Sequence, residues 1–189
     1  MPDPLIYLIC GSTGAGKTTH ARELAERMGG VRFSIDEWMT RLFWMDSPQP
    51  LKATWSMERV ERCLTQIWSI ASRVAERGVP CVLDVGLGQA ASRLRFVKLA
   101  RDFGLSVQLH FVDVPAEERW ARVEVRNARH GETSHLPFAV TREMFDFVER
   151  RWEPPTEEEL AACNGVRISN LRHPSPRGSA SRARASHAD

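Results

Sequence analysis

Residues Gly11–Thr18, which read GSTGAGKT, constrain the fold of this chain more than any other feature. They match the P-loop pattern G-x-x-x-x-G-K-T, in which glycines let backbone N–H groups curl around phosphates. The apolar run of residues 5–10 precedes the loop, and residues 21–28 place apolar side chains at helical spacing. A strand, this loop and a helix form the context that the motif requires. The sequence therefore predicts a nucleoside-triphosphate site.

Each part of the loop has its own expected task. Backbone amides and the positive end of the following helix would hold a β-phosphate. Lys17 would reach the β- and γ-phosphates, and the Thr18 hydroxyl would ligate Mg²⁺. The expected nucleotide-binding residues are Gly11, Ser12, Thr13, Gly14, Ala15, Gly16, Lys17 and Thr18, with ATP and Mg²⁺ as cofactors. The alternative, a glycine-rich turn without a ligand, is disfavoured by the complete pattern in its context.

The composition indicates one soluble domain. The chain has 189 residues, of which 42% are hydrophobic and 26% charged, and its net charge is +2. That length suffices for one domain with a substantial core. No apolar run approaches a membrane span, the N-terminus lacks the features of a secretory leader, and the cysteines form no C-x-x-C pair. We expect a cytoplasmic protein, monomeric or homodimeric, without a membrane partner.

The composition changes near residue 170. Residues 170–189 contain almost no large apolar side chain, so burial there cannot offset the entropy lost on ordering. We expect a P-loop kinase-like domain over residues 1–169 and a disordered basic tail over residues 170–189. The arginines of the tail leave open a loose contact with nucleic acid.

Alternating strand and helix signals predict an α/β fold. Strands are expected near residues 5–10, 31–35, 80–84, 105–112 and 166–168. Helices are expected near residues 21–28, 56–77, 90–103, 115–130 and 141–152. This alternation is typical of a P-loop NTPase with a mostly parallel sheet of about five strands and helices on both faces.

Two acids follow predicted strands, and the carboxyl ends of parallel strands meet at one edge of a sheet. Asp84 ends a short apolar strand, as a Mg²⁺-associated acid does, so Thr18 and Asp84 are the expected metal ligands. Asp36 then becomes the expected base that accepts a proton from an attacking hydroxyl group. An acid at this place can instead cap the following helix, and that alternative stays open for Asp36.

The basic helix expected after the fourth strand carries a stripe of arginines. Arg119, Arg122, Arg126 and Arg129 follow one another by three, four and three residues, which places them on one helix face. Only Glu118 has the i,i+4 spacing to pair with one of them. We expect a helical arginine-bearing lid over the triphosphate, with Arg122 contacting the nucleotide. The alternative is a solvated basic face.

Three tryptophans, Trp38, Trp44 and Trp55, cluster between the second strand and the long helix, where an acceptor would sit. Aromatic side chains in such a position usually fill a core, and we favour that interpretation over stacking on a flat substrate group.

These motifs together resemble the small P-loop kinases that include polynucleotide 5′-kinases, zeta toxins and chloramphenicol phosphotransferase, many of which are described as AAA-family ATPases. The resemblance covers about residues 5–168. It rests on Gly11–Thr18, on FSIDE at residues 33–37, on VLD at residues 82–84, and on FVDVP at residues 111–115 with the arginines that follow.

The resemblance implies a kinase in which Asp36 is the base toward the acceptor and an arginine within residues 126–130 contacts phosphates. Polynucleotide kinases also carry an arginine three residues after the base, where this chain has Met39. The expected catalytic residues are Lys17, Asp36, Arg126 and Arg129. The expected reaction is transfer of the γ-phosphate of ATP to a hydroxyl of a small-molecule acceptor. The alternatives are a polynucleotide 5′-hydroxyl kinase, with nucleic acid as its partner, and a nucleotide switch that hydrolyses ATP without an acceptor.

Overall fold

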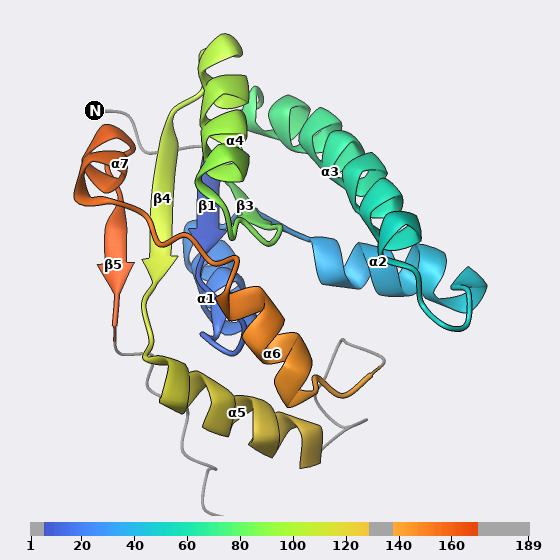
Figure 1. The fold of residues 1–189 in the computed structure, drawn as a ribbon. Helices are drawn as coiled ribbons and strands as arrows, with labels where there is room; N and C mark the ends of the chain where they lie inside the picture. Colours follow the sequence, from blue (N-terminus) through green and yellow to red (C-terminus); the bar gives the residue numbers. More distant parts are fainter. Residues whose placement is uncertain (1–5, 129–137, 170–189) are drawn as a thin grey trace, which may run out of the picture.

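A five-stranded parallel sheet forms the centre of the protein (Figure 1). The computed structural model describes residues 6–128 and 138–169. The strands are β1 (Ile6–Cys10), β2 (Val31–Ser34), β3 (Cys81–Asp84), β4 (Val107–Val112) and β5 (Val166–Ile168). Their spatial order is β2-β3-β1-β4-β5, and every neighbouring pair is parallel. The predicted α/β fold with about five strands is confirmed.

Helices connect successive strands and cover both faces of the sheet. They are α1 (Lys17–Met28), α2 (Ile35–Phe43), η1 (Trp44–Asp46), α3 (Ala53–Ala75), α4 (Ala90–Asp102), α5 (Ala116–Ala128), α6 (Arg142–Glu149) and α7 (Glu157–Ala162). The short elements η1 and α7 were not expected from the sequence. Among the residues that the structure describes, no helix is both long enough and apolar enough to span a membrane.

The central strand β1 is apolar without interruption because both of its faces are covered. Ile6, Leu8 and Cys10 join the core on the side of α3 and α4. Tyr7 and Ile9 join the smaller core on the side of α1. Helix α1 ends where predicted, since Gly29 adopts a left-handed conformation and its N–H group bonds to carbonyl oxygens of the last turn.

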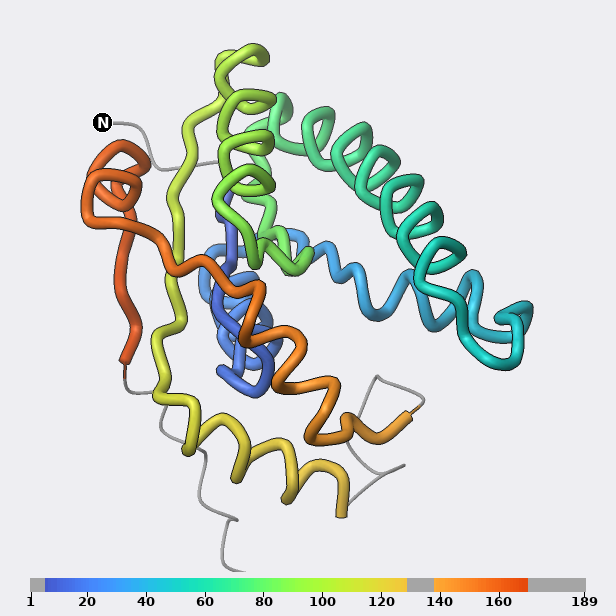
Figure 2. The backbone as a smooth tube through the Cα atoms, viewed as in Figure 1, coloured from blue at the N-terminus to red at the C-terminus, as the bar shows by residue number. Residues whose placement is uncertain are grey.

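The carboxyl ends of the strands define the functional edge of the sheet. Figure 1 shows α1, α5 and α6 gathered at the end toward which the strand arrows point. In Figure 2 the connection between α6 and α7 crosses in front of β4. Trp152 of that connection contacts Phe111 of β4, with ring centroids 5.9 Å apart. The connection therefore holds α6 close to this edge.

The second strand is one residue shorter than predicted, and this changes the place of Asp36. Strand β2 ends at Ser34, whose hydroxyl accepts a hydrogen bond from the N–H of Glu37 and caps α2. Asp36 consequently lies in the first turn of α2 rather than at the end of a strand, and Ser34 rather than Asp36 is the cap. Asp36 is exposed in this position.

Candidate active site

The P-loop packs so closely against α5 that Gly14 cannot be replaced without distortion. Gly14 has φ of +80°, and a Cβ atom there would meet the carbonyl oxygen of Arg119 at 2.5 Å. Gly16, with φ of 94°, is the N-cap of α1 and offers no side-chain hydrogen bond to the first turn. The N–H groups of that turn thus lack a side-chain cap, which leaves the positive helix end suited to an anion.

Lys17 is the first residue of α1 and lies between the loop and two acids. Its Nζ donates a hydrogen bond to the carbonyl oxygen of Ser12 at 3.0 Å. Burial lowers the pKa of Lys17, while the charges of Asp84 and Asp36 raise it. The structure therefore brings the predicted lysine into electrostatic contact with both predicted carboxylates.

The two carboxylates have different surroundings. Asp84, at the end of β3, is 5% exposed, and its Oδ2 accepts a hydrogen bond from Nη1 of Arg32 at 3.0 Å. Asp36 is exposed at the start of α2. A buried, paired carboxylate has a fixed orientation, whereas an exposed one can approach an incoming molecule.

The donor set fits Mg²⁺. Thr18 and Asp84 offer hydroxyl and carboxylate oxygens, which are the ligands that Mg²⁺ prefers. In the described parts of the chain, no group of three or more His, Cys, Asp or Glu side chains is placed to hold a metal by itself. That arrangement is typical of a site where nucleotide phosphates and water complete the coordination of Mg²⁺.

Arg126 of α5 is partly buried and lies near enough to Asp36 to be affected by its charge. Burial lowers the pKa of Arg126, and the negative charge of Asp36 raises it. The Nη2 atom of Arg126 is buried without a hydrogen-bond partner. An unsatisfied buried guanidinium nitrogen is costly, so this nitrogen is suited to an anionic ligand.

Arg122 lies against the P-loop. Its Nη1 donates to the carbonyl oxygen of Ala15 at 3.2 Å. Its Nη2 lies 3.6 Å from Oε2 of Glu118, which is the predicted i,i+4 pair. Arg129 lies outside the described residues, so its expected contact with phosphate stays a prediction.

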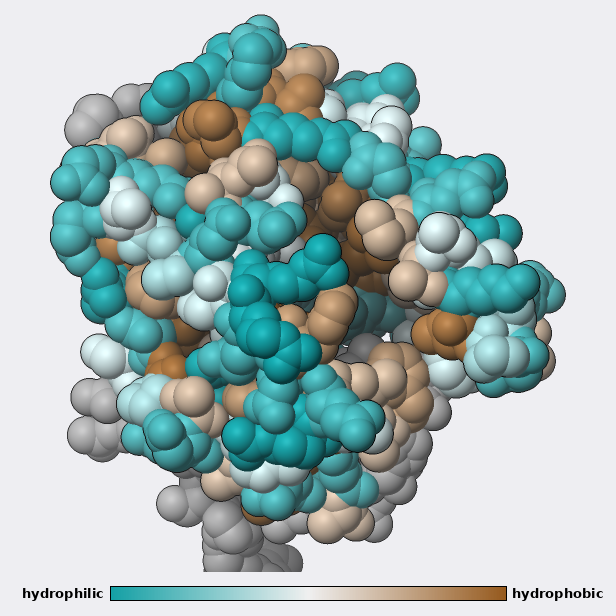
Figure 3. Space-filling view, in the orientation of Figure 1, coloured by the Kyte–Doolittle hydropathy of each residue, from teal (hydrophilic) through white to brown (hydrophobic). Residues whose placement is uncertain are grey.

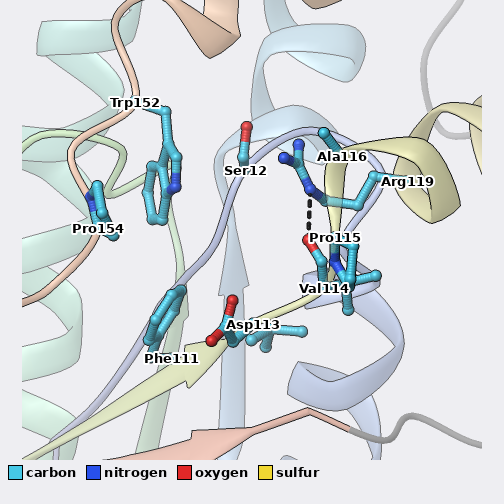
Figure 4. Close-up of a pocket in the computed structure, with 10 residues that line it drawn as sticks. Ser12, Phe111, Asp113, Val114, Pro115, Ala116, Arg119, Trp152 and Pro154 are labelled. Atoms are coloured by element: carbon cyan, nitrogen blue, oxygen red, sulfur yellow. Dashed lines mark hydrogen bonds between the residues drawn. The ribbon is translucent and has the colours of Figure 1, made fainter.

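Arg119 is not part of an exposed stripe, and here the interpretation of the basic helix was wrong. Arg119 is only 5% exposed. Its Nε donates a hydrogen bond to the carbonyl oxygen of Val114 at 2.8 Å (Figure 4), and its Nη1 donates one to the carbonyl oxygen of Thr13 at 3.2 Å. Nη1 and Nη2 also donate to the carboxylate of Glu149 on α6, at 2.7 and 2.6 Å. The prediction considered only acids on the same helix, whereas the neutralising acid comes from another helix.

Glu149 joins α6 to both α5 and the P-loop, because it also accepts a hydrogen bond from the Ser12 hydroxyl. The hydrogen bonds from Arg119 hold the pKa of Glu149 below its usual value, and the bond from Ser12 acts in the same direction. A group with a depressed folded-state pKa stabilises the fold above its unfolded pKa and loses that contribution as pH falls through the folded value.

Replacing Glu149 with Gln is expected to lower the free energy of unfolding by about 2 kcal/mol at pH 7, because the buried charge of Arg119 loses its counterion. Urea unfolding at a series of pH values measures the effect, with Glu143→Gln on the exposed side of α6 as the matched control. The difference between wild type and Glu149→Gln should be fully present above the pKa of an unfolded glutamate, about 4.3, and should shrink as pH falls through the lower pKa of folded Glu149. A difference that does not depend on pH would contradict this assignment.

A hollow opens between α6 and the pair α2–α3 (Figure 3). Helix α2 carries Asp36, Thr40 and Phe43 at i, i+4 and i+7, so these side chains share one helix face. The charge of Asp36 acts on Lys17 and Arg126, so the first turn of α2 lies near the P-loop and α5. Phe43, at the other end of α2, packs against the main core and beneath the guanidinium of Arg59 on α3. The hollow lies beside α2, whose first turn carries the predicted base (Figure 3).

Of the three tryptophans between β2 and the long helix α3, one packs against the core and two make contacts nearer the surface. Trp38 packs against the main core, as expected. The ring of Trp44 lies 5.6 Å from that of Phe138, and the guanidinium of Arg59 lies 4.1 Å from the ring centroid of Trp55. These half-buried aromatic contacts border the α2–α3 side of the molecule rather than its centre.

A cavity of about 240 Å³ lies at the carboxyl end of β4, beside the P-loop (Figure 4). Phe111 and Trp152 form an aromatic wall, and Ser12 and Arg119 lie on another side. Ser12 and Arg119 are already hydrogen-bonded to Glu149, and Ser12 alone among the P-loop residues lines this cavity. The cavity therefore does not coincide with the expected phosphate cradle.

Sequence reasoning missed Arg32, Glu37 as its partner, and Glu149. Arg32 could have been noticed as a charged residue inside a short strand, since a buried charge requires a counterion. Glu149 carried no such signal, because its partner Arg119 lies far away in the sequence. The four cysteines are free and buried, and burial raises the pKa of Cys10 to about 12, which disfavours a reactive thiolate.

Most of the chain matches a known protein family. A family model described as "AAA domain" matches residues 6–151. No curated protein sequence matches the chain. The family match agrees with the expected resemblance to small P-loop kinases.

Several solved structures share the fold. Kti12 of Chaetomium thermophilum, in complex with ADP-AlF3, superimposes with a TM-score of 0.67 at 16% identity, over 87% of this chain and 88% of that chain. The APS kinase CysC of Mycobacterium tuberculosis, in complex with AMPPNP and APS, gives 0.58 at 17% identity over 92% of each chain. A sugar kinase from Janibacter gives 0.60 at 17% identity, over 88% of this chain and 86% of that chain. At such identities the likeness establishes the fold alone.

Proposed function

Since the chain belongs to the AAA domain family, we propose that it is an ATP-dependent kinase that transfers the γ-phosphate of ATP to a hydroxyl group of a small-molecule acceptor. The observation that carries this proposal is the grouping around Lys17, whose pKa responds to the charges of Asp84 and Asp36. The charge of Asp36 also raises the pKa of Arg126. A phosphate loop with a lysine, two carboxylates in different surroundings and an arginine is the set of groups that phosphoryl transfer requires.

In this proposal the P-loop binds the phosphates of ATP. The amides of Gly11–Thr18 and the N-terminal end of α1 hold the β-phosphate, and Lys17 moves from Ser12 to the β- and γ-phosphates. Arg122, already in contact with the loop at Ala15, lies where it can reach the nucleotide. Thr18 and Asp84 would hold Mg²⁺, which when bound offsets charge on the phosphate oxygens.

The acceptor reacts on the side of Asp36. The carboxylate of Asp36 accepts the proton of the acceptor hydroxyl while its oxygen forms a bond to the γ-phosphorus and the bond to the β-phosphate oxygen breaks. ADP is the leaving group. The unpartnered Nη2 of Arg126 gains a hydrogen bond to the transferring group, and Arg129 is a second candidate for this contact.

The acceptor would enter through the hollow between α6 and the α2–α3 pair (Figure 3). The absence of an arginine at Met39, three residues after Asp36, favours a small molecule over a polynucleotide end. We further propose that residues 1–169 form the kinase domain, with residues 170–189 as a tail outside it, in a cytoplasmic monomer or homodimer.

Radiolabelled ATP tests this function. The protein is incubated with [γ-³²P]ATP and Mg²⁺ together with separate panels of small hydroxyl compounds and 5′-hydroxyl oligonucleotides. We expect label to appear in a small hydroxyl compound. Label only in oligonucleotides would instead identify a polynucleotide kinase, and AMPPNP binding without a labelled acceptor would identify a nucleotide switch. Failure to bind AMPPNP would overturn the proposal altogether.

A further inference from the structure

One buried guanidinium connects the two acid-bearing elements of the candidate site. Arg32 lies on β2, and its side chain is 11% exposed. Its Nη1 donates to Oδ2 of Asp84 at 3.0 Å, and its Nη2 donates to Oε1 of Glu37. Asp84 ends β3, and Glu37 lies in the first turn of α2.

The register of the sheet explains this reach. Arg32 lies opposite Val82, and Ser34 lies opposite Asp84. Val82 and Asp84 are two residues apart and share one face of the sheet, so the Arg32 side chain reaches Asp84 by extending past Val82 on that face. The side chain of Asp84 is 6% exposed, which removes water as an alternative partner for Oδ2. Strand geometry thus determines which oxygen of Asp84 is occupied.

The arginine fork restricts both acids at once. A guanidinium is planar and presents its N–H groups in a rigid arrangement, whereas an ammonium is a point charge. Binding Oδ2 limits rotation of the Asp84 carboxylate and directs Oδ1 elsewhere. Binding Glu37 holds the first turn of α2, and the neighbouring residue in that turn is Asp36.

We propose that Arg32 is a positioning residue for phosphoryl transfer, which orients the carboxylate of Asp84 and the helix turn that carries Asp36 through a single guanidinium. This inference rests on the proposed function. Arg32 touches neither nucleotide nor acceptor in this scheme, and acts through Asp84 and Glu37.

A purely structural ion pair makes a different prediction. If Arg32 only neutralised buried acids, Lys at this position would restore most of the function because the charge is kept. If orientation matters, Lys restores stability but not metal binding, since it cannot bond to both carboxylates in a fixed plane. The Arg32→Lys variant therefore separates charge from geometry.

The first test measures binding of Mn²⁺, as a paramagnetic probe for the Mg²⁺ site, to the full chain with AMPPNP by electron paramagnetic resonance. We expect Arg32→Lys to weaken Mn²⁺ binding about tenfold, as loss of an outer-shell partner does. AMPPNP binding without metal and unfolding in urea should stay close to wild type. Arg22→Gln is the matched control, because the half-exposed Arg22 also pairs with Glu37, at 3.5 Å, but does not reach Asp84.

The second test uses Glu37→Ala, which removes the group on α2 that accepts a hydrogen bond from Arg32 and leaves the Arg32–Asp84 pair in place. Mn²⁺ binding should be unchanged, while the rate of γ-phosphate transfer at saturating Mg²⁺-ATP should fall about tenfold. KM for ATP should not change, because the P-loop is untouched.

The outcomes separate this inference from the proposed function. If wild-type protein does not bind AMPPNP, the proposed function and this inference both fail. If wild type binds AMPPNP and Arg32→Lys binds Mn²⁺ as tightly as wild type does, only the role of Arg32 in orienting Asp84 is overturned. Full transfer by Glu37→Ala would overturn the role toward Asp36.

Discussion

Replacement of Lys17 with Met is expected to lower kcat/KM for ATP-dependent transfer by about 10²–10³-fold, the range typical of removing one group that stabilises charge in a transition state. Lys17 is the P-loop cation, its Nζ lies 3.0 Å from the carbonyl oxygen of Ser12, and it adjoins Asp84 and Asp36. Without the Lys17 ammonium, the site has one positive charge fewer to offset the repulsion between the phosphates of ATP and the carboxylates of Asp84 and Asp36. Transfer of label from [γ-³²P]ATP measures the loss.

The loss of activity should not reflect unfolding. Burial already disfavours the charged form of Lys17, since it lowers the pKa of this side chain. Asp84 keeps Arg32 as a partner when Lys17 is replaced. The urea midpoint of Lys17→Met should therefore match that of Lys98→Met, whose side chain is 74% exposed on α4. If Lys17→Met retained wild-type transfer, or lost it only by unfolding, the P-loop assignment would be wrong.

The features predicted most securely from the sequence depend on local rules. The P-loop glycines need backbone conformations and clearances that few other residues tolerate, as Gly14 beside Arg119 illustrates. The uninterrupted apolar run of β1 indicates a strand buried on both faces. Asp84 follows from its place at the end of β3, because parallel strands bring their carboxyl ends together.

What could not be predicted depends on partners that are distant in sequence. The stripe of α5 is exposed only if no other element covers it, and Glu149 of α6 removes Arg119 from it. Helical spacing places Arg119 and Arg126 on one face, but it does not distinguish the buried ion pair of Arg119 from the guanidinium of Arg126, whose Nη2 has no hydrogen-bond partner. The end of the second strand was misplaced by one residue because the Ser34 cap of α2 competes with extension of the strand.

Replacement of Asp36 with Asn is expected to leave AMPPNP binding unchanged while transfer to the acceptor falls by about 10²–10⁴-fold, the contribution typical of a positioned general base. Asp36 is exposed in the first turn of α2, its charge acts on Arg126, and the Ser34 cap of that turn stays intact in the variant. Asn keeps the shape of the side chain but cannot take up a proton. Isothermal titration with AMPPNP and labelled transfer to the acceptor measure the two quantities separately.

Asp46→Asn is the matched control, since Asp46 is an exposed acid just beyond α2 and should tolerate the same change. Comparison of Lys17→Met with Asp36→Asn then distinguishes a kinase from a nucleotide switch. A kinase loses transfer in both variants but keeps nucleotide affinity in Asp36→Asn, because the base acts on the acceptor rather than on ATP. In a switch that only hydrolyses ATP, Asp36 has no acceptor to deprotonate, so its slow hydrolysis would survive this replacement. Wild-type transfer by Asp36→Asn would exclude Asp36 as the base.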